Sequence, residues 1–399
     1  MSTSNEIQSK YFGEFPIGSL CLMPLKGTET FTQNINNFIL EWRKLLVSNK
    51  VYDVFADDFI KDSYILEPEI DRFGSGEAKC VINGTIRGAD IFIIVDVVNH
   101  SATYEMFGHI NHMSPDDHYQ DLKRVIAAAN GKAKRINVIM PFLYESRQHK
   151  RSKRESLDCA MMLQELTNLG VSNILTVDAH DPRVMNAIPL SSFDSLSCYY
   201  QFINAILNKY DDIKIDKDHL AIISPDIGAM QRNIYCANVL GVDLGFFYKR
   251  RDYSKVVDGK NPIVAHEYMG ADVEGKDIIV MDDMIASGDS LIETARSIKQ
   301  RKAKRIFACC TFGLFTKGID IFDAAYKEGI IDGVFTTNCI YQLPELASRD
   351  WYISVDVTEY IARIIESINH DSSISQYLDP YGKIKTRIKQ YTESHSNAN

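Results

Sequence analysis

Two adjacent carboxylates followed by a loop of small residues lie in the sequence DIIVMDDMIASGDSLIETA, residues 277–295. An apolar run ends at Asp282 and Asp283, and the loop after them leads into a helical pattern. Free N–H groups at a helix start, together with the helix dipole, bind phosphate. The carboxylates can accept hydrogen bonds from sugar hydroxyls or hold Mg²⁺ through water. An ordinary turn with a capping box from Ser290 to Glu293 is the alternative, but it leaves the carboxylate pair unexplained, so we favour the phosphate site.

Charged side chains also come after three other apolar runs. Asp178 and His180 follow ILTV, Asp226 follows LAII, and the basic sequence at 249–251 comes after LGFF. In open α/β sheets, ligands bind beyond the carboxyl ends of the strands. Each of these alone would be interpreted as a solvated strand end, but their recurrence predicts a charged ligand.

A further candidate is the basic sequence RQHKRSKR, residues 147–154, in a chain whose net charge is -9. A solvated loop is the simplest explanation of such a run. Its place after the apolar run INVIM favours a contact with a polyphosphate instead.

The elements that position these residues are short apolar runs that alternate with amphipathic stretches. Continuous apolar runs indicate strands buried on both faces, as in parallel sheets. Repeated strand-then-helix units predict an α/β fold with right-handed crossovers. Two successive sets of units hint at a duplication, although we find no convincing sequence repeat. The segment 98–120 lacks periodicity and is predicted to be a long loop. The predicted strands are 91–95, 136–140, 174–177, 220–223, 244–247, 278–281 and 306–310.

Length and composition narrow the class of protein. A chain of 399 residues, 45% hydrophobic and 24% charged, predicts two globular domains with sizeable cores. The acidic balance argues against general nucleic-acid binding. Its apolar runs are far shorter than the roughly 20 residues that cross a bilayer, which predicts no membrane span. The polar start of the chain and eight Cys without metal-site spacing predict a cytoplasmic protein with reduced thiols.

Seven motifs follow one another in a fixed order along the chain: RFGSGE (72–77), IRGADIFII (86–94), RQHKRSKRES (147–156), TVDAHDPRVMNAIP (176–189), SPDIGAMQR (224–232), YKRR (248–251) and VMDDMIASGDS (280–290). Through these motifs, the chain resembles the ribose-phosphate pyrophosphokinase family from about residue 72 to about residue 368. The resemblance implies two tandem phosphoribosyltransferase-like domains, each a mainly parallel sheet flanked by helices. It also implies transfer of the pyrophosphoryl group of ATP to the 1-hydroxyl of ribose 5-phosphate, giving 5-phosphoribosyl 1-pyrophosphate and AMP for nucleotide biosynthesis.

Roles for single residues come from the same resemblance. It implies Mg²⁺ or Mn²⁺ as cofactor, a homo-oligomer of two or more copies, and an RFGSGE loop that completes a neighbouring subunit's site. The segment from about 250 to 260 is predicted to be a mobile lid over the site. The implied assignments are ATP for Phe73, Ser75, Glu77, Arg147, Gln148 and His149; metal for His180 and Asp226; catalysis for Lys249 and Arg251; and ribose 5-phosphate for Asp282, Asp283, Ala286, Ser287, Gly288, Asp289 and Ser290.

The domain organisation is predicted from length and spacing, since no linker marks a boundary. We expect an N-terminal extension over 1–30 and an N-terminal domain with the nucleotide loop over 31–189. A C-terminal domain with the ribose 5-phosphate loop is expected over 190–345, and a helical segment with a tail over 346–399.

Five positions depart from the family pattern. Ser75 replaces an acidic or amide residue, His149 and Tyr248 each replace Asp, and Ala286 and Asp289 alter the phosphoribosyl loop. These last two changes favour a second hypothesis, a catalytically weak or inactive regulatory paralogue, against which the other retained site residues argue. An ordinary phosphoribosyltransferase is a third hypothesis, but such an enzyme does not need the RFGSGE and RQHKR segments.

Overall fold

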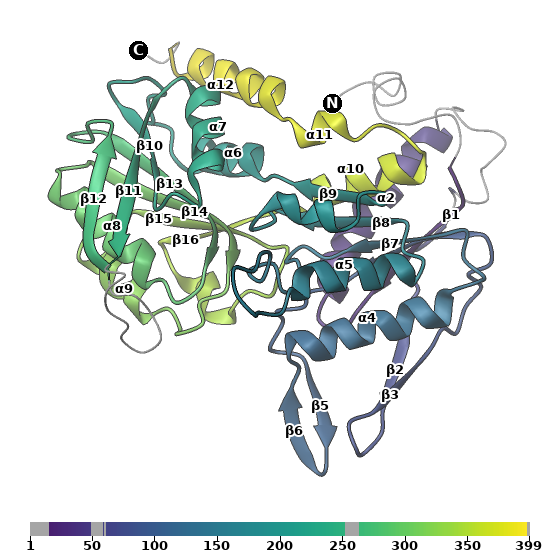
Figure 1. Cartoon of the computed structure of the whole chain (residues 1–399). Coiled ribbons are helices and arrows are strands. Elements are labelled where there is room, and N and C mark those ends of the chain that lie inside the picture. Colours follow the sequence, from purple (N-terminus) through teal and green to yellow (C-terminus); the bar gives the residue numbers. More distant parts are fainter. Residues whose placement is uncertain (1–15, 49–58, 60, 252–262, 397–399) are drawn as a thin grey trace. The chain divides into compact units, whose positions relative to one another are not determined.

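The computed structural model describes residues 16–48, 59, 61–251 and 263–396. These divide into two compact units, each with its own sheet and helices (Figure 1). Unit 1 comprises residues up to 197 together with 338–341 and 356–378. Unit 2 comprises 198–337, 342–355 and 379 onward. The two units interleave in sequence, whereas the expected domains are contiguous. The predicted domain bounds at residues 30, 189 and 345 therefore stay predictions.

Unit 1 is built on a five-stranded parallel sheet in the order β1-β4-β7-β8-β9. Every residue of β4 is buried, as its continuous apolar sequence predicts. β1 was expected to belong to an N-terminal extension, but it pairs with β4 and is part of this sheet. The strands are β1 (Ser19–Pro24), β4 (Ala89–Ile94), β7 (Arg135–Ile139), β8 (Asn173–Val177) and β9 (Ser192–Leu196).

Helices cover both faces of this sheet, with α4 and α5 in front and α2 and α10 behind in Figure 1. A fully buried ion pair joins two of them: Arg43 of α2 donates from Nε to Glu366 of α10 at 2.6 Å. The helical elements are α2 (Glu29–Ser48), α4 (Pro115–Ala129), α5 (Asp158–Asn168), the 3₁₀ helix η1 (Pro182–Ala187), α10 (Thr358–Asn369) and α11 (Ser375–Leu378).

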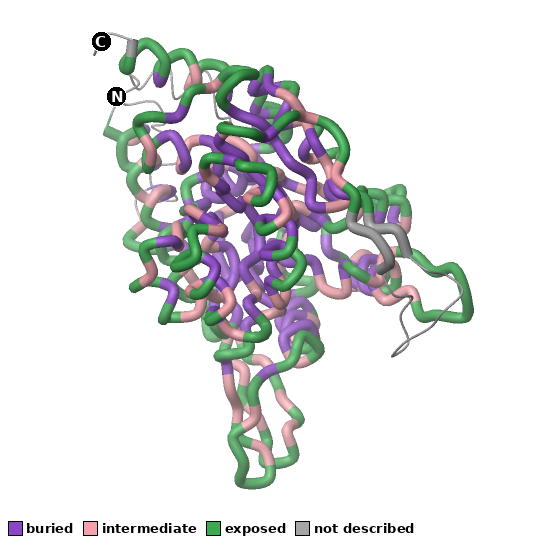
Figure 2. Tube along the Cα trace, turned by 90° about the vertical axis from the view of Figure 1, so that its left-hand side faces the viewer, coloured by how far each residue is buried: buried purple, intermediate pink, exposed green. Residues whose placement is uncertain are grey.

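Two hairpins project from unit 1, and both are far less buried than the sheet (Figure 2). The first pairs β2 (Glu69–Arg72) with β3 (Ala78–Val81), and the second pairs β5 (Thr103–Met106) with β6 (His109–His112). The expectation of a long loop over 98–120 is therefore wrong. Its short strands escape a search for periodicity because neither face of the second hairpin is fully buried.

Unit 2 is built on a seven-stranded sheet in the order β12-β11-β10-β13-β14-β15-β16, parallel except for the antiparallel pair β11–β12. The strands are β10 (Leu220–Ser224), β11 (Asp243–Arg251), β12 (Ile263–Gly270), β13 (Asp277–Ile285), β14 (Arg305–Gly313), β15 (Gly333–Thr337) and β16 (Tyr352–Val355). The helical elements are α6 (Tyr199–Lys209), α7 (Met230–Leu240), α8 (Asp289–Gln300), α9 (Asp320–Lys327), the 3₁₀ helix η2 (Pro344–Ser348) and α12 (Tyr381–Ser396).

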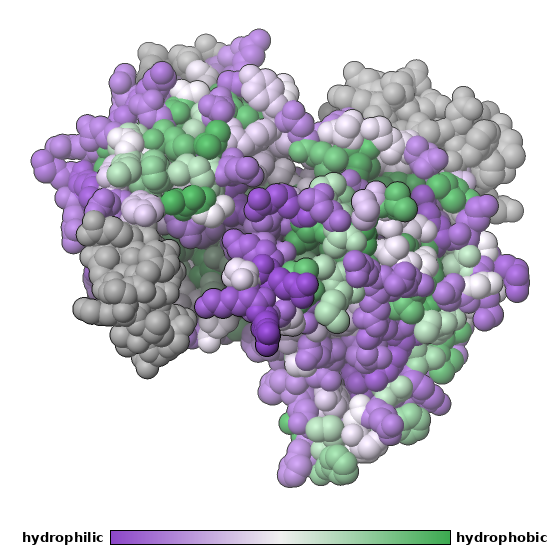
Figure 3. Space-filling view, in the orientation of Figure 1, coloured by the Kyte–Doolittle hydropathy of each residue, from purple (hydrophilic) through white to green (hydrophobic). Residues whose placement is uncertain are grey.

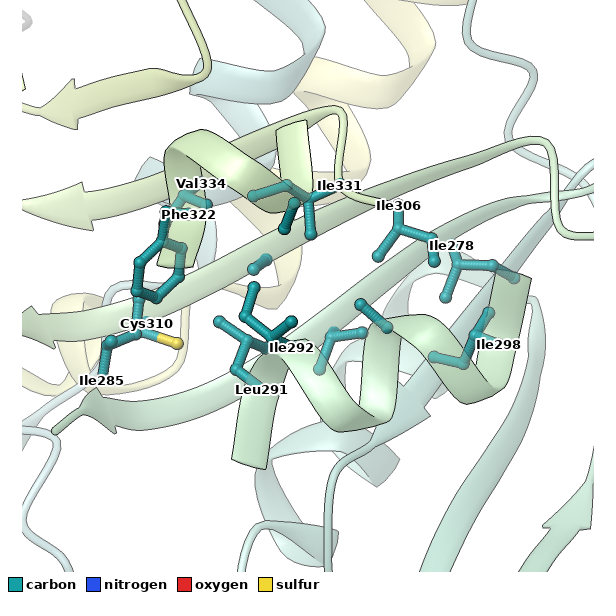
Figure 4. Packing of buried hydrophobic residues seen from close by; sticks show 14 of the residues in the cluster. Ile278, Ile285, Leu291, Ile292, Ile298, Ile306, Cys310, Phe322, Ile331 and Val334 are labelled. Atoms are coloured by element: carbon teal, nitrogen blue, oxygen red, sulfur yellow. The ribbon is translucent and has the colours of Figure 1, made fainter. Parts of the chain in front are cut away.

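The core of unit 2 lies between β13, β14 and the helices α8 and α9 (Figure 4). Leu291, Ala295 and Ile298 of α8 are buried on one face, which confirms the helix predicted from their spacing. Phe322 of α9 packs beside them and is fully buried. This packing fixes the start of α8 at the end of β13, where the acidic pair lies.

The two units repeat one arrangement. The five parallel strands β1-β4-β7-β8-β9 of unit 1 have the same order as β10-β13-β14-β15-β16 of unit 2. An Asp at the start of the second strand forms a bidentate ion pair with an Arg at the start of the third strand in each unit. These pairs are Asp90 with Arg135 and Asp277 with Arg305. The structure therefore contains the duplication that the spacing of strands suggested.

Candidate functional site

The acidic pair of unit 2 lies near the carboxyl end of β13. Asp283 is buried, and Arg232 of α7 lies 3.4 Å from Asp282 and 4.0 Å from Asp283. The backbone N–H of Asp283 donates to the Asp282 carboxylate at 2.9 Å. Burial, and next the charge of Asp283, raise the pKa of Asp282 well above its usual value, while Arg232 opposes this rise. Ligand hydroxyls or a cation would stabilise the ionised pair.

The loop after β13 enters helix α8 through a glycine with a left-handed backbone conformation. Helix α8 begins at Asp289, and its N-cap Gly288 has a left-handed φ of 88° and no side-chain capping bond. A Cβ at Gly288 would lie 2.5 Å from the Phe322 ring, so only glycine fits. Because Ser290 lies inside the first turn, it is not the N-cap that a capping box from Ser290 to Glu293 would need. The predicted capping box with Ser290 as N-cap is therefore wrong, and the phosphate site stays a prediction.

Two residues of this loop that depart from the family pattern, Asp289 and Ala286, have defined hydrogen-bond partners. The Asp289 carboxylate accepts hydrogen bonds from Lys317 at 2.8 Å and from Ser287 at 2.9 Å. These two bonds, Lys317 first, lower the pKa of Asp289. The carbonyl of Ala286 accepts from the N–H of Thr316 at 2.9 Å. The negative charge that Asp289 adds is thus compensated by a neighbouring lysine.

Asp226 follows strand β10 in sequence, and the basic strand β11 pairs with β10 in the sheet of unit 2. Asp226 accepts a hydrogen bond from the N–H of Ala229 at 3.0 Å, and its charge contributes to the raised pKa of Asp282. Lys249 lies near the end of β11 and pairs in register with His266 of β12. Most of the segment predicted to be a mobile lid, 250–260, lies outside the described residues.

The nucleotide-loop candidates of unit 1 lie together at the turn between β2 and β3. The N–H of Phe73 donates to the carbonyl of Glu77 at 2.7 Å, and the Ser75 hydroxyl donates to the Glu77 carboxylate at 2.9 Å. The Phe73 side chain is half exposed. This turn therefore presents an aromatic ring and a carboxylate to solvent.

The β5–β6 hairpin supports this turn from the side. The N–H of Phe107 donates to the carbonyl of Gly74 at 2.9 Å. Arg72, at the end of β2, donates to Asp121 of α4 at 2.6 Å and lies over the ring of Tyr104. The predicted nucleotide loop is thus held by a hairpin that the sequence did not reveal.

The segments after β7 and β8 carry four further predicted residues and bring two of them, His149 and His180, together. Arg147 is exposed, and Gln148 donates to the carbonyl of Ser156 at 2.8 Å. The ring of His149 lies 5.3 Å from the ring of His180, measured between centroids. The surface of the loop of residues 147–155 is strongly hydrophilic (Figure 3). The basic sequence therefore faces solvent beside the histidine pair.

Asp181 lies beside these histidines. Its carboxylate accepts hydrogen bonds from the side chain and the N–H of Arg183, and the side-chain bond contributes most to a pKa lowered to about 2. The two predicted metal residues, His180 and Asp226, belong to different units. Within the described part of the chain, no group of three or more His, Cys, Asp or Glu side chains is arranged to hold a metal ion.

Sequence reasoning gave no role to Arg232 or Lys317. Arg232 ends the quoted motif SPDIGAMQR, so its place in a family motif was the available signal. Lys317 is distant in sequence from the loop that it contacts, and no local pattern connects them.

The repeated sheets and the short loop between an acidic pair and α8 define a protein of two tandem phosphoribosyltransferase-type domains. Residues 26–170 match the N-terminal domain of ribose phosphate pyrophosphokinase, and residues 199–327 match the phosphoribosyl transferase domain. The chain belongs to the ribose-phosphate pyrophosphokinase family and is an enzyme of the diphosphotransferase class.

Individual relatives agree with this assignment. Ribose-phosphate pyrophosphokinase of Vibrio parahaemolyticus is 28% identical over 317 residues, which cover 77% of this chain and 90% of that protein. The enzyme of Thermotoga maritima is 29% identical over 313 residues, which cover 77% of this chain and 88% of that protein. The phosphoribosylpyrophosphate synthetase of Mycobacterium smegmatis has the same fold, with a TM-score of 0.67 at 19% identity, covering 89% of this chain and all of that one.

Among the described residues, no helix has the length and apolar character to cross a bilayer.

Proposed function

We propose that this enzyme transfers the pyrophosphoryl group of ATP to the 1-hydroxyl of ribose 5-phosphate, yielding 5-phosphoribosyl 1-pyrophosphate and AMP for nucleotide biosynthesis. The observation that carries the proposal is the acidic pair Asp282–Asp283 at the mouth of an uncapped helix start in unit 2. A ligand with neighbouring hydroxyls and a phosphate group fits this combination, and ribose 5-phosphate has both.

The ribose 5-phosphate site is supported by two features of unit 2. The carboxylates of Asp282 and Asp283 would accept hydrogen bonds from the ribose hydroxyls, which would favour their ionised forms. The N–H groups of residues 286–290 would bind the 5-phosphate together with the dipole of α8. Lys317, which pairs with Asp289, keeps the loop from repelling that phosphate.

The ATP site is supported by the surface of unit 1. The exposed ring of Phe73 is available to stack on adenine, and Ser75 and Glu77 offer polar atoms beside it. Arg147 and Gln148 would add a cation and an amide to the nucleotide contacts. The RFGSGE loop is proposed to complete the site of a neighbouring copy in a homo-oligomer.

The chemistry needs positioning and positive charge and no covalent nucleophile. In phosphoryl-type transfer, the hydroxyl attacks the phosphorus in line, and cations stabilise the developing oxygen charge. Lys249 and Arg251 would supply that charge near the end of β11. A divalent Mg²⁺ or Mn²⁺ ion would neutralise charge on ATP. The imidazole of His180 in unit 1 and the carboxylate of Asp226 in unit 2 are each a donor that such an ion can bind.

A cytoplasmic location is proposed on the chemistry of the thiols. None of the eight cysteines forms a disulfide, and seven of them are buried. Cysteines without disulfides are typical of a reducing compartment.

The decisive experiment is an assay of AMP release by the purified protein with ATP, Mg²⁺ and ribose 5-phosphate. We expect AMP to form only when both substrates are present. The competing hypothesis, a catalytically weak or inactive regulatory paralogue, predicts ATP binding with little or no AMP release. The paralogue hypothesis is based on Ala286 and Asp289. The hydrogen bond from Lys317 to Asp289 weakens this hypothesis, because it compensates the added negative charge.

The catalytic assignment has its own test. Lys249→Ala should lower the turnover number by about 100-fold or more, the scale of lost electrostatic stabilisation in a transition state. The Michaelis constants should change little, since binding shared by ground and transition states does not speed chemistry. A variant with normal turnover and weakened binding would show that Lys249 only holds substrate.

A further inference from the structure

A cavity of about 290 Å³ lies at the carboxyl end of β1 in unit 1. Its apolar lining residues are buried or partly buried, whereas three charged residues of the lining are exposed and lie at its mouth. These charged residues are Lys26, Glu29 and Glu67. We propose that this cavity is a binding site for an α-amino acid with an apolar side chain.

The cavity lies where α/β folds bind ligands. Pro24 ends β1, and Leu25 and Lys26, which follow it, line the cavity. In open α/β sheets, ligands bind beyond the carboxyl ends of the strands. β1 has the same place in the strand order of unit 1 as β10 has in unit 2, and Asp226 follows β10. The cavity therefore follows the strand of unit 1 that matches a strand of the candidate site in unit 2.

The apolar part of the wall suits a small hydrocarbon group. Leu25 and Met113 are buried, and Ile70 is partly buried. An apolar ligand group that displaces water from such a wall is stabilised by the hydrophobic effect. The volume is at the lower end of the range for small-molecule sites, about 300–1,000 Å³, which favours a ligand smaller than a nucleotide.

Charges of both signs lie at the mouth without being paired with each other. Lys26 donates to the carbonyl of Thr103 at 2.5 Å and forms no ion pair with any described residue. The Glu29 carboxylate accepts the backbone N–H of Gly27 at 2.8 Å, and in the described part of the chain neither Glu29 nor Glu67 has a cationic partner. A ligand that carries both an ammonium and a carboxylate group would pair with both kinds of charge.

The balance of these charges argues against a phosphate ligand. Arg72 also lines the cavity, but it is neutralised by the Asp121 carboxylate at 2.6 Å. The two remaining carboxylates, Glu29 and Glu67, outnumber the one remaining cation, Lys26. A phosphate would be repelled, whereas the ammonium group of an amino acid would be attracted. The apolar wall in turn favours an amino acid over a polyamine, which has no apolar side chain.

The walls of the cavity are held by contacts between different elements. The Arg72 guanidinium lies 4.5 Å from the centroid of the Tyr104 ring, and the Tyr104 hydroxyl donates to Asp117 of α4 at 3.3 Å. The bond from Lys26 to Thr103 joins the end of β1 to β5. The site is thus largely preformed, as small-molecule sites usually are. Because Arg72 begins the RFGSGE loop, a bound ligand would lie against the base of that loop.

Isothermal titration calorimetry of the full-length protein tests the site. The probes are L-leucine, L-methionine and L-phenylalanine, and at least one should bind with a Kd of about 1 mM or below. Two analogues test the need for both charges: 4-methylpentanoate is leucine without its ammonium group, and 3-methylbutylamine is leucine without its carboxylate. Each should bind about fivefold more weakly than leucine, the scale of one lost ion pair.

Three variants test the location. Glu67→Gln should weaken amino-acid binding about fivefold. Glu69→Gln, which alters an exposed carboxylate outside the lining, should leave binding unchanged. Met113→Trp should fill the cavity and abolish binding. Hydrogen exchange of the peptide 69–81, which contains Arg72, should slow when the amino acid is added to the wild type and should not change in Met113→Trp.

The inference would be overturned if none of the three amino acids bound at about 10 mM. It would also be overturned if either analogue bound as tightly as leucine, or if Glu67→Gln and Met113→Trp both left binding unchanged. Glu67→Gln alters only an exposed side chain, so it keeps the test decisive if Met113→Trp does not fold. Binding is measured without ATP or ribose 5-phosphate. Its failure therefore leaves the proposed function intact, and an absence of AMP release leaves this site intact.

Discussion

Asp96 of unit 1 and Asp283 of unit 2 occupy matching positions in the duplicated sheet. Each comes six residues after the aspartate, Asp90 or Asp277, that starts the second strand of its set. Each is buried, with 2% and 4% of its surface exposed. The duplicated sheet thus places a buried carboxylate at the matching position of each unit.

The surroundings of the two carboxylates differ. Asp96 accepts hydrogen bonds from the N–H groups of Tyr341 at 2.6 Å and Val98 at 3.1 Å, and so anchors a returning segment of its unit. Asp283 has Asp282 before it, whereas the residue before Asp96 is the fully buried Val95. A second carboxylate in place of a valine therefore distinguishes the candidate binding site from a structural contact.

The next segments of the chain differ as well. In unit 2 the chain passes from the acidic pair through a short loop into α8, whereas in unit 1 it passes into the β5–β6 hairpin. Only the first arrangement places the start of a helix directly after the carboxylates. The two units share the order of their strands and differ in the segment after the second strand.

The ion pairs at the other end of the sheets should show the largest difference in stability. Arg305→Met would remove the bidentate partner of the buried Asp277 and leave Lys304, whose Nζ lies 3.9 Å away; breaking such a pair typically costs about 3–5 kcal/mol. Arg135→Met should cost less, because the Asp90 carboxylate still accepts hydrogen bonds from Asn137 and Asn369. Amide hydrogen exchange of β4 and β13 peptides measures each unit separately. Equal losses of protection in both units would contradict this.

The matching aspartates should differ sharply in activity. Asp283→Asn should lower kcat/KM for ribose 5-phosphate by about 100-fold, since a hydrogen bond to a charged group is lost from the substrate. Asp96→Asn keeps an acceptor for the N–H groups of Tyr341 and Val98 and should change activity by less than about threefold. Steady-state kinetics and ATP binding are measured for both. A similar loss in both variants would show that the two carboxylates serve the scaffold alike.

The pH dependence of the free energy of unfolding should also distinguish Asp96 from Asp283. Burial raises the pKa of Asp96 to about 7, against 3.8 for the free side chain. The native state therefore holds this proton where the unfolded state has lost it, so stability falls as pH rises from about 4 to 7 and is level above 7. Between pH 5 and 7 the wild type should lose about 2–3 kcal/mol relative to Asp96→Asn. Urea unfolding monitored by exchange in β4 checks this, and parallel curves would refute it.

The fold was predictable where apolar runs are continuous. The seven predicted strands correspond to β4, β7, β8, β10, β11, β13 and β14, because strands covered on both faces must be apolar throughout. The hairpin strands were missed because they are short and exposed. Five strands of the two main sheets were not predicted either: β1, β9, β12, β15 and β16. The sequence of β2, EIDR, carries three charges and gives no sign of pairing.

The candidate site was predictable where its residues are contiguous. The Asp282–Asp283 pair and its loop lie in one segment, and local spacing was enough to identify them. The contact of His149 with His180 and that of Arg232 with Asp282 join distant segments. Only the order of the strands brings such residues together, and the sequence pattern leaves that order open.

The smallest expected effect concerns the charge at the start of α8. Asp289→Asn removes a negative charge close to the proposed phosphate and releases Lys317 from its ion pair, so KM for ribose 5-phosphate should fall about two- to fivefold. The helix loses an acidic first-turn residue, which should lower the free energy of unfolding only slightly. Lys317→Met is the matched control and should raise KM. Both effects should shrink at high salt, because the pair is exposed and screened. A raised KM in Asp289→Asn would instead mean that Asp289 holds the loop through Ser287, and the phosphoribosyl loop would then depend on this departure rather than tolerate it.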